Sequence, residues 1–141
     1  MTDNKEMFDI NRFFTRDNSE KGVPFEPVVD GEKVGISFNV ISYSSIKAAR
    51  AVEKFNKEIE ELKKEEDAEV QRRRTLELNA ELATALVVGF SGGSRGEVVM
   101  DGEPLKYSES VCYAIMLNSL PIANAIIEHS LKVKNFMGRS A

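Results

Sequence analysis

Apolar residues recur at steps of three and four along a charged stretch in the middle of the chain, and this period limits the possible folds more than any other feature. The residues that keep it are Ala48, Val52, Phe55, Ile59 and Leu62. This spacing places them on one face of an amphipathic helix. Two serines at 44–45 come just before it and can accept hydrogen bonds from the amides of a first turn. The pattern therefore predicts a helix over about 44–66.

The apolar period fades after this stretch and then resumes. Between residues 63 and 74 only Ala68 and Val70 are apolar, so this segment is either a solvated helix or a break between two helices. We favour a break or bend. The apolar stripe resumes at Leu76, so a second helix is expected over about 70–89. It would end at Gly89, because glycine accepts the left-handed geometry that often follows a helix.

An extended segment precedes the helices. Apolar residues alternate with small or polar ones over 34–40, which is the period of a half-buried strand. An Asp-Gly pair at 30–31 tolerates the positive φ angles of a tight hairpin turn. The preceding strand holds two prolines, which cannot donate to a sheet, so it is expected at a sheet edge. The sequence therefore predicts a β-hairpin over 23–42, with its first strand at the edge.

Two shorter helices are expected beyond a glycine-rich loop at 91–96. Ser108 is a candidate N-cap for a helix over about 108–118. Ser119, together with Pro121, is expected to start a last helix over about 120–135. Pro121 suits the first turn, where its missing amide costs little.

The length of 141 residues favours one hydrophobic core. We expect an irregular N-terminal arm over 1–22, a single domain over 23–137 and a short tail over 138–141. The fold class predicted is mainly α with a small N-terminal β-hairpin (α+β), with four or so helices packed in one domain.

Charge and composition exclude several kinds of partner. The net charge of -4 argues against nucleic acid, since affinity for phosphates rests on clustered Lys and Arg. The longest apolar run, residues 83–90 with one threonine, is far too short to span a bilayer, and no apolar stretch follows the N-terminal Met. Cys112 is the only cysteine, which rules out an intramolecular disulfide and suits a reducing compartment. We therefore expect neither a membrane nor a nucleic-acid partner.

The residues that enzymes and metal sites use do not gather at usable spacings. The glycine-rich loop lacks the Gly-Lys-Ser/Thr ending of a phosphate-binding loop and is interpreted as a flexible connector. His129 is the only histidine and lies beside an apolar stripe, which favours a partly buried helix residue over a metal ligand or a base. The acidic run 65–67 lacks the spaced ligands of a calcium loop. We predict no enzyme activity, no cofactor and no metal site.

Two groups of residues are candidates for binding another protein. An arginine run at 72–74 is favoured as solvated helix surface, with an electrostatic docking site as the alternative. Two apolar pairs, at 13–14 and 136–137, are favoured as folding back onto the core. The alternative is that they are exposed anchors, since aromatic residues and Met are enriched at interfaces. The candidate protein-binding residues are Phe13, Phe14, Arg72, Arg73, Arg74, Phe136 and Met137.

Five short motifs follow one another in a characteristic order. They are Asn-Arg-Phe-Phe-Thr-Arg at 11–16, Phe-Asn-Val-Ile-Ser at 38–42, Ala-Leu-Val-Val-Gly-Phe at 85–90, Asp-Gly-Glu-Pro-Leu-Lys-Tyr-Ser at 101–108 and Pro-Ile-Ala at 121–123. In layout and in these motifs, the chain resembles the tail assembly chaperones of long-tailed, siphovirus-type bacteriophages. The likeness covers most of the chain, and none of the motifs is a catalytic signature.

The resemblance implies a function in binding. Such proteins bind the long helical tape measure protein, keep it soluble and recruit the tail tube protein during tail assembly. It further implies a homo-oligomer without a cofactor, which acts in the host bacterial cytoplasm and is absent from the mature virion. Many members also have a longer form made by ribosomal frameshifting, which a protein sequence does not reveal. The alternative is a small structural tail or head-tail connector protein that is retained in the virion.

Overall fold

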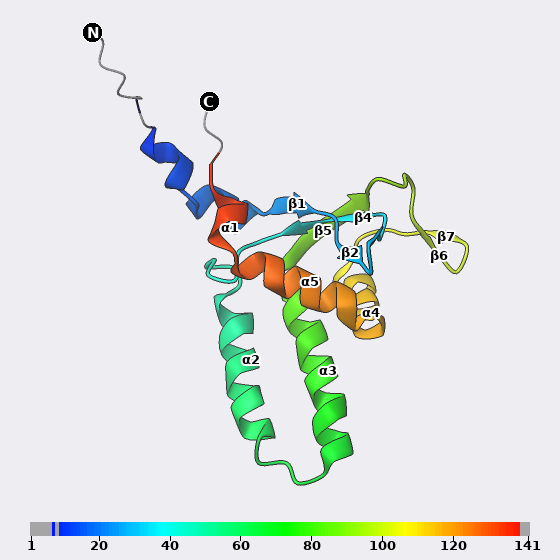
Figure 1. The fold of residues 1–141 in the computed structure, drawn as a ribbon. Coiled ribbons are helices and arrows are strands. Elements are labelled where there is room, and N and C mark those ends of the chain that lie inside the picture. The colour runs from blue at the N-terminus through cyan, green and yellow to red at the C-terminus, as the bar shows by residue number, and fades with distance from the viewer. Residues whose placement is uncertain (1–6, 8, 139–141) are drawn as a thin grey trace.

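The computed structural model describes residue 7 and residues 9–138 and shows a mixed α+β fold in which helices predominate (Figure 1). Its elements are η1 (Ile10–Phe13), α1 (Arg16–Lys21), β1 (Val23–Phe25), β2 (Val28–Val29), β3 (Glu32–Lys33), β4 (Ile36–Val40), α2 (Ala49–Leu62), α3 (Ala68–Ala85), β5 (Val87–Gly92), β6 (Val99–Met100), β7 (Glu103–Pro104), α4 (Glu109–Asn118), α5 (Leu120–Leu131) and η2 (Val133–Phe136).

The N-terminal hairpin is present, and its turn lies where the sequence predicts it. Asp30 and Gly31 have φ angles of 53° and 80°, which suit a tight hairpin turn, and they join the short strands β2 and β3. Further from the turn, β1 pairs antiparallel with β4, with Val23 opposite Val40. The order β1-β4-β5 leaves β1 at the edge of the sheet, as its prolines require.

The third strand of this sheet corrects the prediction of a helix over 70–89. The helix α3 ends at Ala85, and β5 runs antiparallel to β4 over Val87–Gly92. Valine and phenylalanine are favoured in strands, and β5 is stabilised by pairing with β4, which the sequence pattern alone does not reveal. Gly89 therefore lies inside a strand opposite Asn39 and does not end a helix. Residues 91–92 of the expected loop also belong to β5.

The break between the two central helices is confirmed. The helices α2 and α3 form a helical hairpin that projects from the rest of the molecule (Figure 1). The side chain of Asp67 caps α3 by accepting hydrogen bonds from the amides of Glu69 and Val70. The helix α2 begins at Ala49, later than predicted, because the preceding residues form turns; Ser45 Oγ accepts a hydrogen bond from the amide of Ala48 there.

The two C-terminal helices begin at the predicted caps. Ser108 Oγ accepts a hydrogen bond from the amide of Val111 at the start of α4, and Ser119 Oγ accepts one from Ile122 at the start of α5. Pro121 lies in the first turn of α5. The last helix is shorter than predicted, since α5 ends at Leu131 and the 3-10 helix η2 follows.

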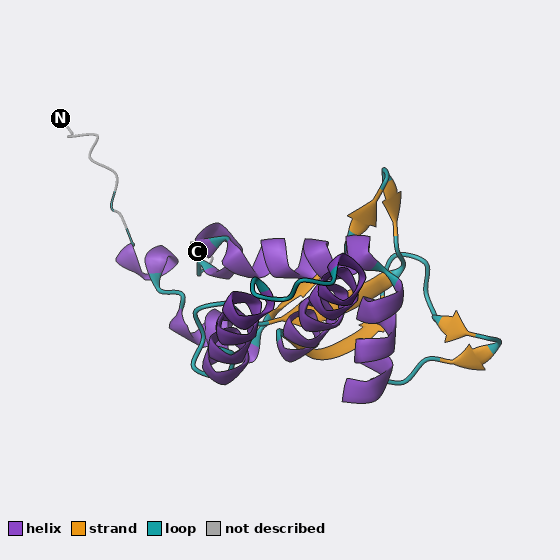
Figure 2. Cartoon of the chain, turned by 90° about the horizontal axis from the view of Figure 1, so that it is seen from below, coloured by secondary structure: helices purple, strands orange, loops and turns teal. Residues whose placement is uncertain are grey.

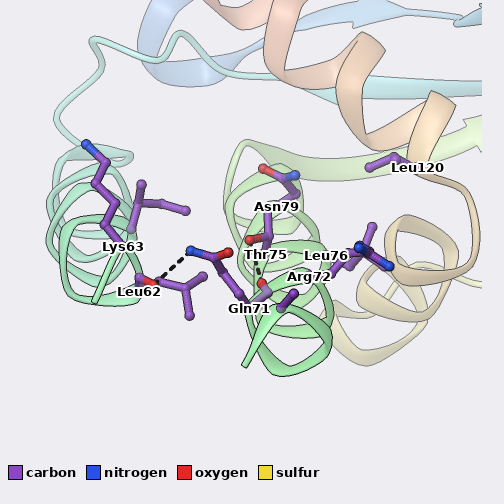
Figure 3. Close-up of a pocket in the computed structure, with 10 residues that line it drawn as sticks. Leu62, Lys63, Gln71, Arg72, Thr75, Leu76, Asn79 and Leu120 are labelled. Carbon is purple, nitrogen blue, oxygen red and sulfur yellow. Dashed lines mark hydrogen bonds between the residues drawn. The ribbon is translucent and has the colours of Figure 1, made fainter. Parts of the chain in front are cut away.

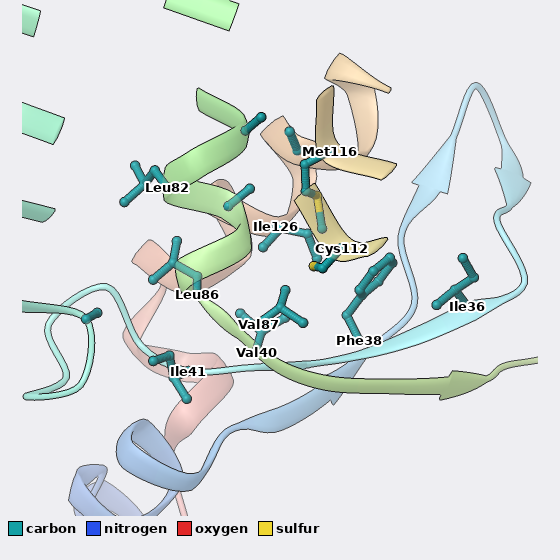
Figure 4. Packing of buried hydrophobic residues seen from close by; sticks show 14 residues of the cluster. Ile36, Phe38, Val40, Ile41, Leu82, Leu86, Val87, Cys112, Met116 and Ile126 are labelled. Atoms are coloured by element: carbon teal, nitrogen blue, oxygen red, sulfur yellow. The ribbon is translucent and has the colours of Figure 1, made fainter. Parts of the chain in front are cut away.

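The hydrophobic core lies between the sheet and the helices α3, α4 and α5. Figure 4 shows side chains from these helices directed toward β4 and β5. The fully or almost fully buried members include Phe38, Val40, Ala83, Leu86, Cys112, Met116 and Ile126. The short hairpins β2–β3 and β6–β7 project away from this body (Figure 2).

The described part of the expected arm contains two short helices and joins the domain at α1, which corrects the prediction of an irregular segment. The backbone carbonyl of Ser19, which is buried, accepts a hydrogen bond from the amide of Ser42, and the side-chain amide of Asn18 donates to the carbonyl of Phe136. Gly22, with φ at 89°, ends α1. Residues 1–6 and 8 of the arm, and 139–141 of the tail, lie outside the described residues.

Candidate protein-binding surface

A groove runs along one face of the α2–α3 hairpin, beneath the start of α5 (Figure 3). Its volume is about 610 Å³. The residues that line it are Ile59, Leu62, Lys63, Ala68, Gln71, Arg72, Thr75, Leu76, Asn79 and Leu120. Leu62 at the end of α2 and Lys63 just after it lie on one side, and Leu76, Arg72 and Leu120 lie on the other (Figure 3).

The sides of the groove present apolar surface to solvent. Leu76 is 39% exposed and Leu120 is 40% exposed, so large apolar side chains remain partly uncovered on both α3 and α5. Polar groups between the sides are partly satisfied by the protein's own backbone. Gln71 Nε2 donates to the carbonyl of Leu62 at 3.2 Å, and Thr75 Oγ1 donates to the carbonyl of Gln71 at 2.8 Å. Gln71 and Thr75 therefore each keep a hydrogen bond when apolar side chains of a partner are buried against them.

The charged residues that line the groove are both basic. Lys63 Nζ donates to Glu60 at 2.8 Å, and Arg72 makes no ion pair with any residue of the described part of the chain. Among the described residues, no aspartate or glutamate lines the groove. Lys63 is therefore already paired on the exposed surface, and Arg72 brings an uncompensated positive charge to the border of the groove.

The opposite face of the helical hairpin is charged and internally paired. Arg74 lies 3.0 Å from Glu58, 3.2 Å from Glu77 and 3.6 Å from Glu81, and so links α2 to α3. Burial lowers the pKa of Arg74, but the hydrogen bond to Glu77 and the charges of Glu81 and Glu58 outweigh burial and raise it overall. Arg74 is therefore a structural brace on the face away from the groove.

The three arginines at 72–74 do not form one patch. Arg72 lines the groove, Arg73 is exposed and lies 3.6 Å from Glu69, and Arg74 is directed toward α2. Successive helical residues point about 100° apart, which separates the three side chains. Only Arg72 of these candidates lies at the apolar groove.

The two apolar pairs differ in how far they are exposed to solvent. Phe13 and Phe14 are 50% and 62% exposed, with the guanidinium of Arg12 at 5.3 Å from the ring of Phe13. Phe136 is only 1% exposed and packs its ring edge against His129, with 6.0 Å between centroids, while Met137 is partly buried. Phe136 is thus a core residue, whereas Phe13 and Phe14 remain at the surface.

Sequence reasoning missed the groove itself. The pattern places Leu76 in an apolar stripe and Leu120 at the start of the last helix, but no local signal brings the two together. The nearest signal is the cap Ser119, which fixes where α5 begins and therefore where Leu120 lies above α3.

Cys112 is fully buried and His129 is partly buried. Burial raises the pKa of the Cys112 thiol to about 11, so that it stays protonated at neutral pH and is a poor nucleophile. His129 is a half-buried helix residue, as predicted, stacked on Phe25 with 4.0 Å between ring centroids. Within residues 7 and 9–138, no group of three or more His, Cys, Asp or Glu side chains is placed to hold a metal ion.

Over the same residues, no single helix is both long enough and apolar enough to cross a membrane. The helices α4 and α5 have the necessary length and hydropathy only when they are counted together, and the chain bends by 111° between them. Comparison of the chain with protein families, curated proteins and solved structures found no match.

Proposed function

We propose that this protein is a phage tail assembly chaperone, which binds and solubilises the tape measure protein and recruits tail tube subunits during tail morphogenesis. The observation behind the proposal is the apolar groove on the projecting α2–α3 hairpin, taken together with the sequence motifs that resemble this family.

The groove suits such a function physically. A long helical protein with an apolar surface aggregates if that surface stays in contact with water. A groove formed by helices can cover an apolar stripe of such a helix, while the charged opposite face with Arg74, Glu58 and Glu77 keeps the complex in solution.

The proposal includes self-association in the host bacterial cytoplasm and absence from the mature virion. The strands β1 and β5 lie at the two edges of the three-stranded sheet, and a sheet edge is a ready site for pairing with a second copy. Light scattering across a range of protein concentrations tests this part. A strict monomer at every concentration would contradict it.

The central test is co-expression with the tape measure protein from the same phage genome. We expect the tape measure protein to be insoluble alone, and soluble and co-purified when this chain is present. Failure of both effects would reject the chaperone function. Mass spectrometry of purified virions separates the chaperone from a structural tail or connector protein, since a chaperone should be absent or scarce in the particle.

A further inference from the structure

The groove has the length of a short helical segment. Its lining on α3 runs from Ala68 to Asn79, which at 1.5 Å per residue is about 16 Å, or roughly three helical turns. A partner helix of that length presents apolar side chains at steps of three and four along one face. Leu62 on one side and Leu76 and Leu120 on the other would contact that face (Figure 3).

A partner segment in an extended conformation would find no sheet edge to pair with along this groove. Peptides that add a strand need an open sheet edge, whose amides and carbonyls pair with their own. Most of the backbone along this groove lies within α2 and α3, where its groups are hydrogen-bonded within the helices, and none of the lining residues belongs to a strand. A helix satisfies its own backbone, so it is the form of chain that can lie in the groove without losing hydrogen bonds.

The charges select the partner. Lys63 and Arg72 lie on opposite sides of the groove (Figure 3), and no acidic residue of the described part of the chain lines it. Two copies of this chain docked groove to groove would bring these like charges together, which is unfavourable. A helix with acidic residues on both flanks of its apolar stripe would pair with Arg72 on one side. On the other side it would share Lys63 with Glu60, whose ion pair with Lys63 is exposed and weak.

We infer that the groove binds one amphipathic helix of the tape measure protein, with an apolar stripe of about three turns that packs on Leu62, Leu76 and Leu120 and acidic flanks that face Lys63 and Arg72. The inference rests on the proposed function for the source of the helix. The selectivity for acidic flanks rests on the groove alone.

Two synthetic helical peptides test the selectivity. They share one apolar stripe, and one has Glu on both flanks while the other has Lys. Titrated with the full chain and followed by fluorescence anisotropy, the Glu peptide should bind roughly tenfold more tightly than the Lys peptide. Equal binding of the two peptides, or binding of neither, overturns the inference.

Adjacent arginines provide a matched pair of variants. Arg72→Glu should remove or reverse the preference for the Glu peptide, whereas Arg73→Glu makes the same charge change on the outer surface and should leave the preference intact. Both side chains are exposed, so neither substitution should disturb folding. Loss of the preference in both variants to the same degree would indicate a general charge effect and overturn the inference.

Leucine variants test the apolar contact. Leu76→Asn and Leu120→Asn should each weaken binding of both peptides about tenfold, whereas Leu131→Asn, at a position 56% exposed and outside the groove, should not. Thermal unfolding monitors whether each variant remains folded. If Leu120→Asn instead breaks up a homodimer, the groove is occupied by a second copy, which overturns the inference.

Co-purification with the tape measure protein separates the inference from the proposed function. If wild type and Arg72→Glu retain the tape measure protein equally, the groove inference is wrong while the chaperone function stands. If the Glu peptide binds selectively but the tape measure protein never co-purifies with wild type, the chaperone function fails and the tape measure protein is not the source of the helix.

Discussion

Glu26 and Ser94 tie the glycine-rich loop to the first hairpin, although 68 residues separate them. One carboxylate oxygen of Glu26 accepts a hydrogen bond from the backbone amide of Ser94 at 2.8 Å, and the other accepts one from its hydroxyl at 2.6 Å. The second oxygen also accepts from the amide of Gly35 at 3.0 Å. The loop is therefore anchored at Ser94, where the sequence predicts a flexible connector.

This anchor should depend on pH. The hydrogen bond from the Ser94 hydroxyl, followed by that from its amide, lowers the pKa of Glu26 below its ordinary value of 4.5. The stabilisation from these hydrogen bonds is then complete above about pH 4.5. It is lost as the pH falls through the lower pKa that Glu26 has in the folded state, because Glu26 takes up its proton at a higher pH in the unfolded chain. Glu26→Gln should lower the urea midpoint at neutral pH, and the gap from wild type should narrow in acid.

Glu97→Gln is the matched control for this prediction, since Glu97 is an exposed carboxylate near the same loop. Its urea midpoint should follow that of wild type at every pH. A gap between Glu26→Gln and wild type that stays constant across the acid range would show that the carboxylate charge is not the cause.

His129 should make the fold less stable in mild acid. Asn135 Nδ2 lies 3.1 Å from His129 Nδ1. Because the amide nitrogen is the donor, Nδ1 is the acceptor and the ring proton is on Nε2. Nε2 is buried and has no partner among the described residues. Burial, and then the charge of Lys132, lowers the pKa of His129 below 6.5. Stability is therefore complete above pH 6.5 and is lost as the pH falls from 6.5 to the lowered pKa.

The variant His129→Phe should abolish this loss, because phenylalanine can stack on Phe25 and takes up no proton. Urea midpoints on both sides of pH 6.5 measure the effect. If wild type and His129→Phe lose stability in parallel, the histidine does not cause the loss.

Arg74 should contribute to stability more than its neighbour does. Arg74→Met leaves Glu58, Glu77 and Glu81 facing one another without a cation and should cost about 1 kcal/mol, a modest figure because Arg74 is partly exposed to solvent. Arg73→Met breaks one exposed pair and should cost less than about 0.5 kcal/mol. Equal free energies of unfolding for the two variants would contradict the assignment of Arg74 as a brace.

The aromatic candidates should divide into one core residue and surface residues. Phe136→Ala should lower the free energy of unfolding by about 3 to 5 kcal/mol, because its ring is buried against His129. Phe14→Ala should change it by less than about 0.5 kcal/mol, because the side chain is mostly exposed. Chemical denaturation measures both, and any loss of tape measure binding by the folded Phe14→Ala would identify this residue as an anchor.

Local signals in the sequence predicted much of the fold. The Asp-Gly turn, the alternation along β4 and the caps Ser108 and Ser119 each depend on neighbours in the chain, and all are present. The strand β5 was missed because a short apolar run suits a buried helix end and a buried strand equally well. Only pairing with β4, which is distant in sequence, decides between them.

The candidate site could not be predicted for a related reason. The sequence correctly marked Leu76 as part of an apolar stripe, and it named Arg72 within a run of three arginines. Which of these arginines lies at an apolar surface depends on how α2, α3 and the start of α5 are placed around the groove. That placement is set by the hydrophobic core and not by the local pattern.

The contact between α1 and η2 determines where the protein can be labelled. Asn18 donates to the backbone of Phe136, and a Cβ added at Gly138 would lie 2.9 Å from the carbonyl of Asn11, so both ends of the described chain lie side by side. They are far from the loop that joins α2 to α3 (Figure 1). A fluorescent protein or affinity tag fused at either terminus would leave the tip of the helical hairpin unobstructed.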